Sequence, residues 1–171
     1  MSALDRRDLS RSRRTQLAAL AAALALTVAA VPAAAMSVRA TKLTTAEQVF
    51  VKQYKRLIPA LDKASAAVVT AVNDSSKFSN AQVVSVFTAV AKQWASATKP
   101  LLALAVPPQV SSIFKTIARD VPAVEADLLA AANSGRTQNG SAAKVAGREL
   151  ALNFNALDAA VAKLKLKLKL P

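Results

Sequence analysis

The sequence predicts an all-α fold: an irregular antiparallel four-helix bundle with proline-kinked helices, preceded by a helical signal segment. Two observations support this prediction. Only 3 of the 171 residues are glycine, whereas alanine, the residue with the highest helix propensity, is abundant. Apolar residues also recur at alternating spacings of three and four in four segments, the pattern of amphipathic helices.

The first helix is predicted to begin near Thr44 and Thr45, where Glu47 can complete a capping box. Pro59 lies inside this helix and predicts a kink, because proline lacks a backbone donor and clashes with the preceding turn. The polar run 73–80 then forms a connector. The apolar stripe consists of Phe50, Tyr54, Leu57, Leu61, Ala64, Val68 and Val72.

The second helix is predicted to start at Ser79 or Asn80, either of which can serve as its N-cap. Pro100 should bend or end this helix, and residues 101–104 can add one more turn. Its apolar stripe consists of Val83, Phe87, Val90, Trp94, Ala97 and Leu101. The positions of Trp94 and Tyr54 on such stripes predict core packing for both side chains.

Residues 106–108 are predicted to end the second helical segment and to begin the third helix, with Pro108 in its first turn, where proline is acceptable. Pro122 interrupts this helix, and Gly135 is the expected left-handed residue at its end. Its apolar stripe consists of Val110, Ile113, Ile117, Val121, Val124, Leu128 and Ala131.

The fourth helix follows a polar loop at 136–140, with Ser141 as its expected N-cap. We expect it to extend to about Lys165 or Lys167 and then to fray. Its apolar stripe consists of Val145 or Ala146, followed by Leu150, Phe154, Leu157, Val161, Leu164 and Leu168.

A Lys-Leu repeat occupies residues 162–170 and has a strict period of two, which is typical of a strand. However, Leu164 and Leu168 continue the helical stripe, and lysines are favourable at a helix C-terminus. Three interpretations stay open: a solvated last turn, contact with an anionic surface, or a strand that pairs with another chain. The candidate anionic-surface residues are Lys163, Lys165, Lys167 and Lys169.

Residues 1–40 have the pattern of an export signal: an arginine-rich start, an apolar core at 17–30 and small residues before the cleavage site. Cleavage is expected after Ala35 or Ala40, which leaves residues 41–171 as the helical domain. The segment 12–17 is similar to a twin-arginine motif, and both that route and general secretion remain open. The predicted location is periplasmic, cell-wall associated or extracellular; the alternative is an uncleaved N-terminal membrane anchor.

Composition limits the chemistry of the chain. It contains no cysteine and no histidine, and both methionines lie in the first forty residues. Ser-His-Asp and Cys-His catalysis are thereby excluded, and the usual soft or imidazole metal ligands are missing. The acidic residues Asp120, Glu125 and Asp127 are predicted to lie on a solvated helix face. We therefore expect a non-enzymatic protein with no catalytic, cofactor-binding or metal-binding residues.

The chain is strongly basic, with a formal net charge of +13. The first forty residues hold six arginines and two aspartates, which leaves +9 for the remainder. A basic exported protein tends to meet anionic polymers and lipid head groups. We therefore expect an anionic envelope polymer or lipid as a partner, and no nucleic acid. A small apolar ligand is a further candidate, because alanine-rich, kinked helices can leave a cavity between them.

A short segment in the middle of the chain resembles small exported bacterial helical-bundle proteins of unknown function. The similarity rests on the pattern Leu-x-x-Leu-x-x-Pro-Pro, which joins the bundle halves in those proteins and is formed here by Leu101, Leu104, Pro107 and Pro108. The resemblance implies a helical fold and export. The expected function is a binding or structural role in the cell envelope or extracellular space, with apolar-ligand carriage or sensing, or anionic-surface binding, as alternatives.

Overall fold

The computed structural model describes residues 43–170, and about 90% of them are helical. Four long helices account for most of this part of the chain: α2 (Thr45–Asp74), α3 (Asn80–Leu102), α4 (Ser111–Thr137) and α5 (Gly140–Leu168). Two 3₁₀ turns, η1 (Ser75–Lys77) and η2 (Pro108–Val110), lie in the connections. The predicted all-α helical bundle is confirmed. The predicted signal segment lies outside the described residues.

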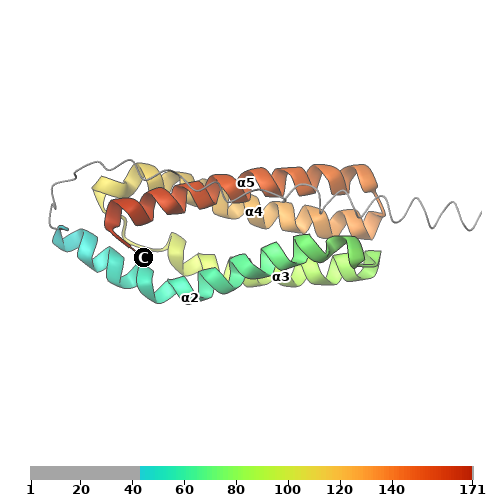
Figure 1. Cartoon of the computed structure of the whole chain (residues 1–171), viewed down its shortest axis with the longest axis horizontal. Helices are drawn as coiled ribbons and strands as arrows, with labels where there is room; N and C mark the ends of the chain where they lie inside the picture. Colours follow the sequence, from blue (N-terminus) through green and yellow to red (C-terminus); the bar gives the residue numbers. More distant parts are fainter. Residues whose placement is uncertain (1–42, 171) are drawn as a thin grey trace, which may run out of the picture.

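The helices lie side by side along one long axis, and each reverses the direction of the one before it (Figure 1). Helix α2 packs on α3, α3 packs on α4, and α4 packs on α5, whereas α2 and α5 make few contacts. The bundle is therefore least closed along the seam between α2 and α5.

Capping boxes begin the first two of these helices. Thr44 accepts a hydrogen bond at Oγ1 from the backbone N–H of Glu47, and the Glu47 carboxylate accepts one from the backbone N–H of Thr44 at 2.7 Å. Ser79 and Gln82 form the same reciprocal pair at the start of α3. Each box satisfies two backbone donors that the first helical turn leaves free.

The predicted apolar stripes form the core. The largest fully buried side chains come from all four helices and from η2. They are Phe50, Val68, Val72, Val83, Phe87, Val110, Ile117, Leu128, Leu150, Leu164 and Leu168. The helices are continuous through Pro59 and Pro122, and α3 ends two residues after Pro100.

The predicted connection between the last two helices was wrong in detail. Helix α4 continues past Gly135 to Thr137, and Gln138 is the left-handed residue, with φ = 52°. Gly135 instead lies buried inside α4 against the first turn of α3, where an added Cβ would come within 2.9 Å of Val83 Cγ1. The N-cap of α5 is Asn139, not Ser141, and its side chain accepts from the backbone N–H of Ala142.

The Lys-Leu repeat is helical up to Leu168, slightly further than predicted. Lys169 then adopts the left-handed conformation with φ = 52°, and the Leu170 N–H donates to the Lys165 carbonyl at 2.9 Å. This pairing is a Schellman motif, which satisfies carbonyls at the end of the helix. Leu170 packs against the core, so the end of α5 is fastened to the bundle.

Candidate functional site

A groove with a cavity volume of about 260 Å³ runs along the seam between α2 and α5. Its lining is mainly apolar. Helices α3 and α4 contribute one buried residue each, Leu101 and Val121, and the remaining residues come from α2 and α5. Those residues are Tyr54, Ile58, Leu61, Asp62, Ser65, Ala66 and Val69 on α2, and Phe154, Leu157, Asp158, Val161 and Lys165 on α5.

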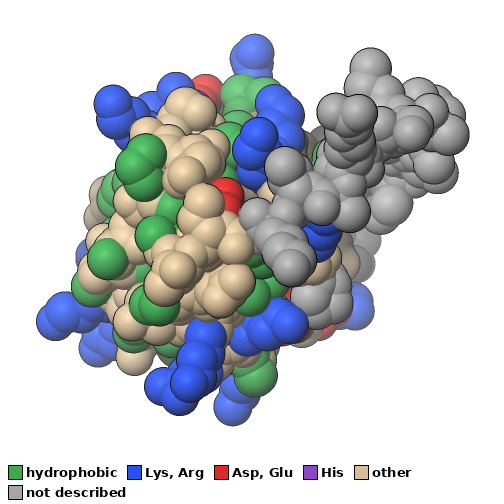
Figure 2. Space-filling model, turned by 90° about the vertical axis from the view of Figure 1, so that its left-hand side faces the viewer, with side chains coloured by type: hydrophobic (Ala, Val, Ile, Leu, Met, Phe, Trp, Pro, Cys, Tyr) green, Lys and Arg blue, Asp and Glu red, His purple; other side chains and the backbone are tan. Residues whose placement is uncertain are grey.

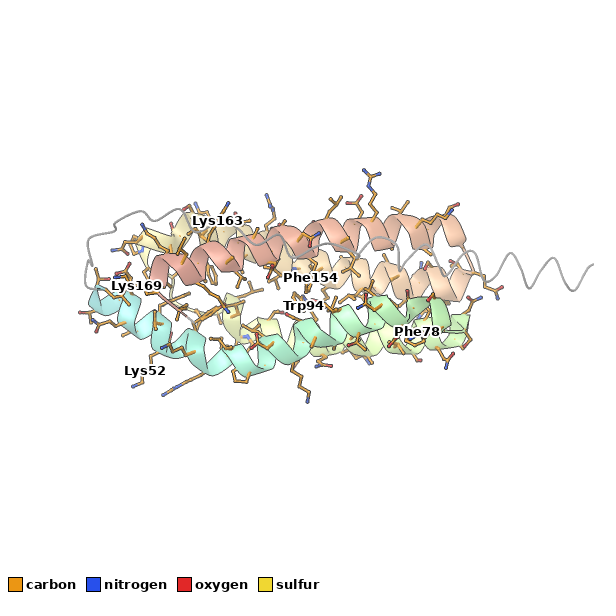
Figure 3. All side chains as sticks on the ribbon, in the orientation of Figure 1. Lys52, Phe78, Trp94, Phe154, Lys163 and Lys169 are labelled. Atoms are coloured by element: carbon orange, nitrogen blue, oxygen red, sulfur yellow. The ribbon has the colours of Figure 1, made fainter. Side chains whose placement is uncertain are left out.

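The α5 side of the groove is supported by Trp94 of α3. The Trp94 and Phe154 rings lie 5.9 Å apart between centroids, and Figure 3 shows both in the middle of the bundle. The Trp94 indole N–H donates to the backbone carbonyl of Val121 at 3.0 Å. Because this hydrogen bond is buried and joins α3 to α4, it fixes the indole directly behind Val121 and Phe154, which line the groove.

The α2 side of the groove is supported by a second group of aromatic rings. Tyr54 lines the groove and stacks on Phe50, with 6.0 Å between ring centroids. Phe50 in turn meets Phe114 of α4 edge-on at 5.9 Å. Burial raises the pKa of Tyr54, and the nearby Asp62 carboxylate raises it further. The Tyr54 hydroxyl therefore stays protonated at neutral pH and can donate a hydrogen bond at the groove.

The charged groups of the groove come from both long walls. Asp62 of α2 and Asp158 of α5 are exposed, and Lys165 of α5 is half-buried. Two carboxylates against one ammonium group give the groove a net negative lining, although residues 41–171 carry about +9. This local reversal of sign favours a ligand whose polar end is positive or donates hydrogen bonds.

The four predicted anionic-surface lysines do not share one face of α5. Lys165 lines the groove, whereas Lys163, Lys167 and Lys169 are exposed. Figure 3 shows Lys163 and Lys169 at the C-terminal end of α5. Figure 2 looks toward this end of the molecule, and Lys and Arg side chains project in several directions there. The helix therefore distributes around its axis the charges that a strand would have aligned.

The predicted acidic cluster is not a single solvated face. Asp120 is only 2% exposed and accepts hydrogen bonds from Arg119, with 2.6 Å between Nε and Oδ1. Asp127 accepts a hydrogen bond from the side chain of Asn153 on α5 at 2.7 Å, and its pKa is raised mainly by burial. Asp120 and Asp127 therefore take part in structural hydrogen bonds, which the spacing of the acidic residues in the sequence did not indicate. Within residues 43–170, no group of three or more acidic side chains is placed to hold a metal ion.

No protein-family model, curated protein or solved structure matches this chain. Among the helices of residues 43–170, none combines the length and the apolar character needed to cross a membrane. The fold and the groove define the protein as an all-α helical bundle with an apolar surface groove between its first and last described helices.

The sequence predicted the buried positions of Tyr54 and Trp94 correctly. It suggested that a cavity could form between the helices but did not indicate that α2 and α5 form the groove. The available signal was the width of the apolar face of α2, where Ile58 and Val69 are apolar residues outside the predicted stripe and line the groove together with Leu61. When one side of a helix makes few contacts, part of such a wide apolar face stays exposed. The sequence alone does not indicate that α2 and α5 are the pair that packs less closely.

Proposed function

We propose that this chain is an exported, non-enzymatic binding protein that carries or senses a small apolar molecule. The observation that carries this proposal is the apolar groove between α2 and α5. In this proposal the four helices act as one antiparallel bundle that stays open along the α2–α5 seam. Ligand sites are commonly built between the helices of such bundles.

The size and charge of the groove define the ligand further. Its volume of about 260 Å³ lies just below the ~300–1,000 Å³ of pockets for drug-sized ligands, which favours a smaller molecule. Because Asp62 and Asp158 outnumber Lys165 at the groove, a positively charged or hydrogen-bond-donating end is favoured over an anionic one. A medium-chain alkylamine has this combination of an apolar body and a cationic end.

Trp94 provides the readout for a binding experiment, because it is the only tryptophan in the chain and packs against Phe154 in the groove wall. Purified protein is titrated with decylamine, decanol and decanoate, three probes with similar apolar chains and different head-group charges. We expect a saturable change in fluorescence with decylamine and decanol, and binding of decanoate weaker by on the order of tenfold. A flat response to all three probes would contradict the proposal.

A matched pair of variants locates the binding site. Ala66→Phe places a large side chain in the groove, whereas Ala60→Phe adds the same side chain to an exposed position of α2 outside it. The first should weaken decylamine binding by at least about tenfold, and the second should leave it unchanged. Equal binding by both variants, with helicity intact by circular dichroism, would place the ligand elsewhere.

The remaining parts of the proposal rest on the sequence. Export is supported by the signal pattern in residues 1–40 and by the resemblance around Pro107 and Pro108. A non-enzymatic role is supported by the absence of histidine and cysteine from the whole chain.

A second candidate function is contact with an anionic lipid surface or wall polymer through the end of α5. The observation that favours it is the exposure of Lys163, Lys167 and Lys169 around the last turns of this helix. Each lysine near an anionic surface contributes about 1 kcal/mol of attraction. Deleting residues 163–171 would not test this idea, because the deletion would also remove the buried Leu164 and Leu168.

Charge neutralisation tests the second candidate without disturbing the core. The triple variant Lys163→Gln, Lys167→Gln, Lys169→Gln should lose at least about tenfold in affinity for vesicles of mixed anionic and neutral phospholipid. The control variant Lys52→Gln, Lys55→Gln, Lys63→Gln removes the same charge from exposed positions on α2. Equal losses of vesicle affinity in the two triple variants would show only a general charge effect and would reject the end of α5 as the contact site.

A further inference from the structure

The outward face of α5 carries a line of apolar side chains that has no role in the core or in the groove. Val145, Leu152 and Leu166 are 61%, 53% and 83% exposed, and they are three of the seven exposed large hydrophobic residues in the described part of the chain. Together with the exposed Ala159, they recur at intervals of seven residues. Seven residues are close to two helical turns, so these side chains follow one line along α5.

A second line runs beside the first and is also spaced by seven. It consists of Glu149, Ala156 and Lys163, all exposed. The two lines together alternate at spacings of four and three, which is the geometry of a coiled-coil seam. The buried stripe of α5, which includes Leu150, Leu157 and Leu164, is separate from this seam. Helix α5 therefore has one apolar face toward the bundle and a second, narrower one toward the outside.

The outer seam is complementary to itself when reversed. Glu149 lies seven residues before Ala156, and Lys163 lies seven residues after it. In an antiparallel pair of α5 helices centred near Ala156, Glu149 of each copy comes opposite Lys163 of the other, and Leu152 comes near Ala159. In a parallel pair, the seam would instead place Glu149 against Glu149 and Lys163 against Lys163, which is unfavourable.

We propose that two copies of this chain associate through the outer seam of α5 as an antiparallel, two-fold symmetric pair. Alanines at the centre allow the two helix backbones to approach closely, and the larger side chains at Leu152 and Leu166 meet small or aliphatic surface of the other copy. Because the interface is isologous, each favourable pair occurs twice. This proposal is independent of the ligand groove, whose α5 residues, such as Leu157 and Val161, lie off the seam.

The first experiment is a charge exchange, read out by sedimentation equilibrium of the purified protein across a wide concentration range. Glu149→Lys alone and Lys163→Glu alone each place two like-charged pairs at the interface and should raise the dimer dissociation constant about tenfold. The double variant Glu149→Lys, Lys163→Glu restores opposite charges and should return the constant to near the wild-type value. A double variant weaker than both single variants contradicts the proposed register.

A matched pair of apolar variants separates the seam from the rest of the surface. Leu152→Lys should abolish association, whereas Leu129→Lys, at an exposed position of α4, should leave it unchanged. Equal effects overturn the assignment to α5. The exposed Leu166 between Lys163 and Lys167 also resembles a lipid-contacting face, so the same proteins are tested for sedimentation with anionic vesicles. A protein that stays monomeric at every concentration overturns the proposal, whether or not it binds vesicles.

Orientation is tested by disulfide cross-linking, which is clean because the chain has no native cysteine. Ala156→Cys lies at the centre of the antiparallel seam and should form a disulfide-linked dimer on mild oxidation. Val145→Cys should not link to itself but should link to Leu166→Cys when the two variants are mixed. Self-linking of Val145→Cys without linking to Leu166→Cys indicates a parallel pair and overturns the proposal.

Discussion

At the scale of single residues, Gly135 determines how closely α4 approaches the start of α3. Its position inside a helix is unfavourable for glycine by about 1 kcal/mol relative to alanine. However, a Cβ at this position would lie 2.9 Å from Val83 Cγ1 and 3.1 Å from the backbone carbonyl oxygen of Asn80. The Asn80 carbonyl oxygen belongs to the backbone and has little freedom to move. The close contact between α3 and α4 therefore requires a residue without a Cβ at position 135.

Gly135→Ala is therefore expected to destabilise the protein in spite of the gain in helix propensity. Overpacking of a core contact costs ~1–3 kcal/mol, and the propensity gain offsets ~1 kcal/mol of this. We expect a net loss on the order of 1 kcal/mol in the free energy of unfolding, measured by urea denaturation. Adding Val83→Ala to the variant relieves one of the close contacts, so the loss attributed to Gly135 should shrink in that background. An increase in stability for the single variant would contradict this account.

The same residue shows why the end of α4 could not be predicted from its sequence. Asn-Ser-Gly is a common helix-terminating pattern, and glycine is favoured at left-handed positions. Glycine is also favoured where two backbones approach closely. The local sequence cannot distinguish these two reasons, and here Gln138 takes the left-handed position three residues later.

At the scale of helices, the apolar stripes and the N-caps of α2 and α3 could be predicted because both are local. In each capping box the two partners lie within one helical turn: Thr44 pairs with Glu47 in α2, and Ser79 pairs with Gln82 in α3. The Lys-Leu repeat was resolved by its phase: Leu164 and Leu168 continue the stripe and are buried, whereas Leu166 falls between them and is exposed. The period-two pattern alone would have suggested a strand.

The groove could not be predicted because it depends on the distance between α2 and α5, which lie at opposite ends of the described sequence. Its charged residues, Asp62 and Asp158, appear in the sequence as ordinary exposed aspartates. Only the packing of α2 on α3, α3 on α4 and α4 on α5 brings them to one groove. Periodicity predicts which face of a helix is apolar. It does not predict which two helices pack less closely and so leave part of that face exposed.

At the scale of the whole molecule, the chain is divided between the expected export signal at 1–40 and the helical part. We predict that material recovered outside the cell begins at Met36 or Thr41, because small residues precede both positions. N-terminal sequencing of the secreted protein measures this directly. Intact Met1 in the membrane fraction, with no shorter species, would instead support an uncleaved anchor.

The capping box at the start of α2 has a consequence for the precursor. Within the described residues, the groups that cap the N-terminus of this helix lie between Leu43 and Gln48: Thr44 and Glu47 satisfy each other, and the Gln48 amide donates to the Leu43 carbonyl at 3.0 Å. Both expected cut sites lie upstream of these residues. A peptidase that cuts after Ala35 or Ala40 therefore leaves these hydrogen bonds between residues 43 and 48 in place, and the precursor and the processed protein can share the same first helical turn.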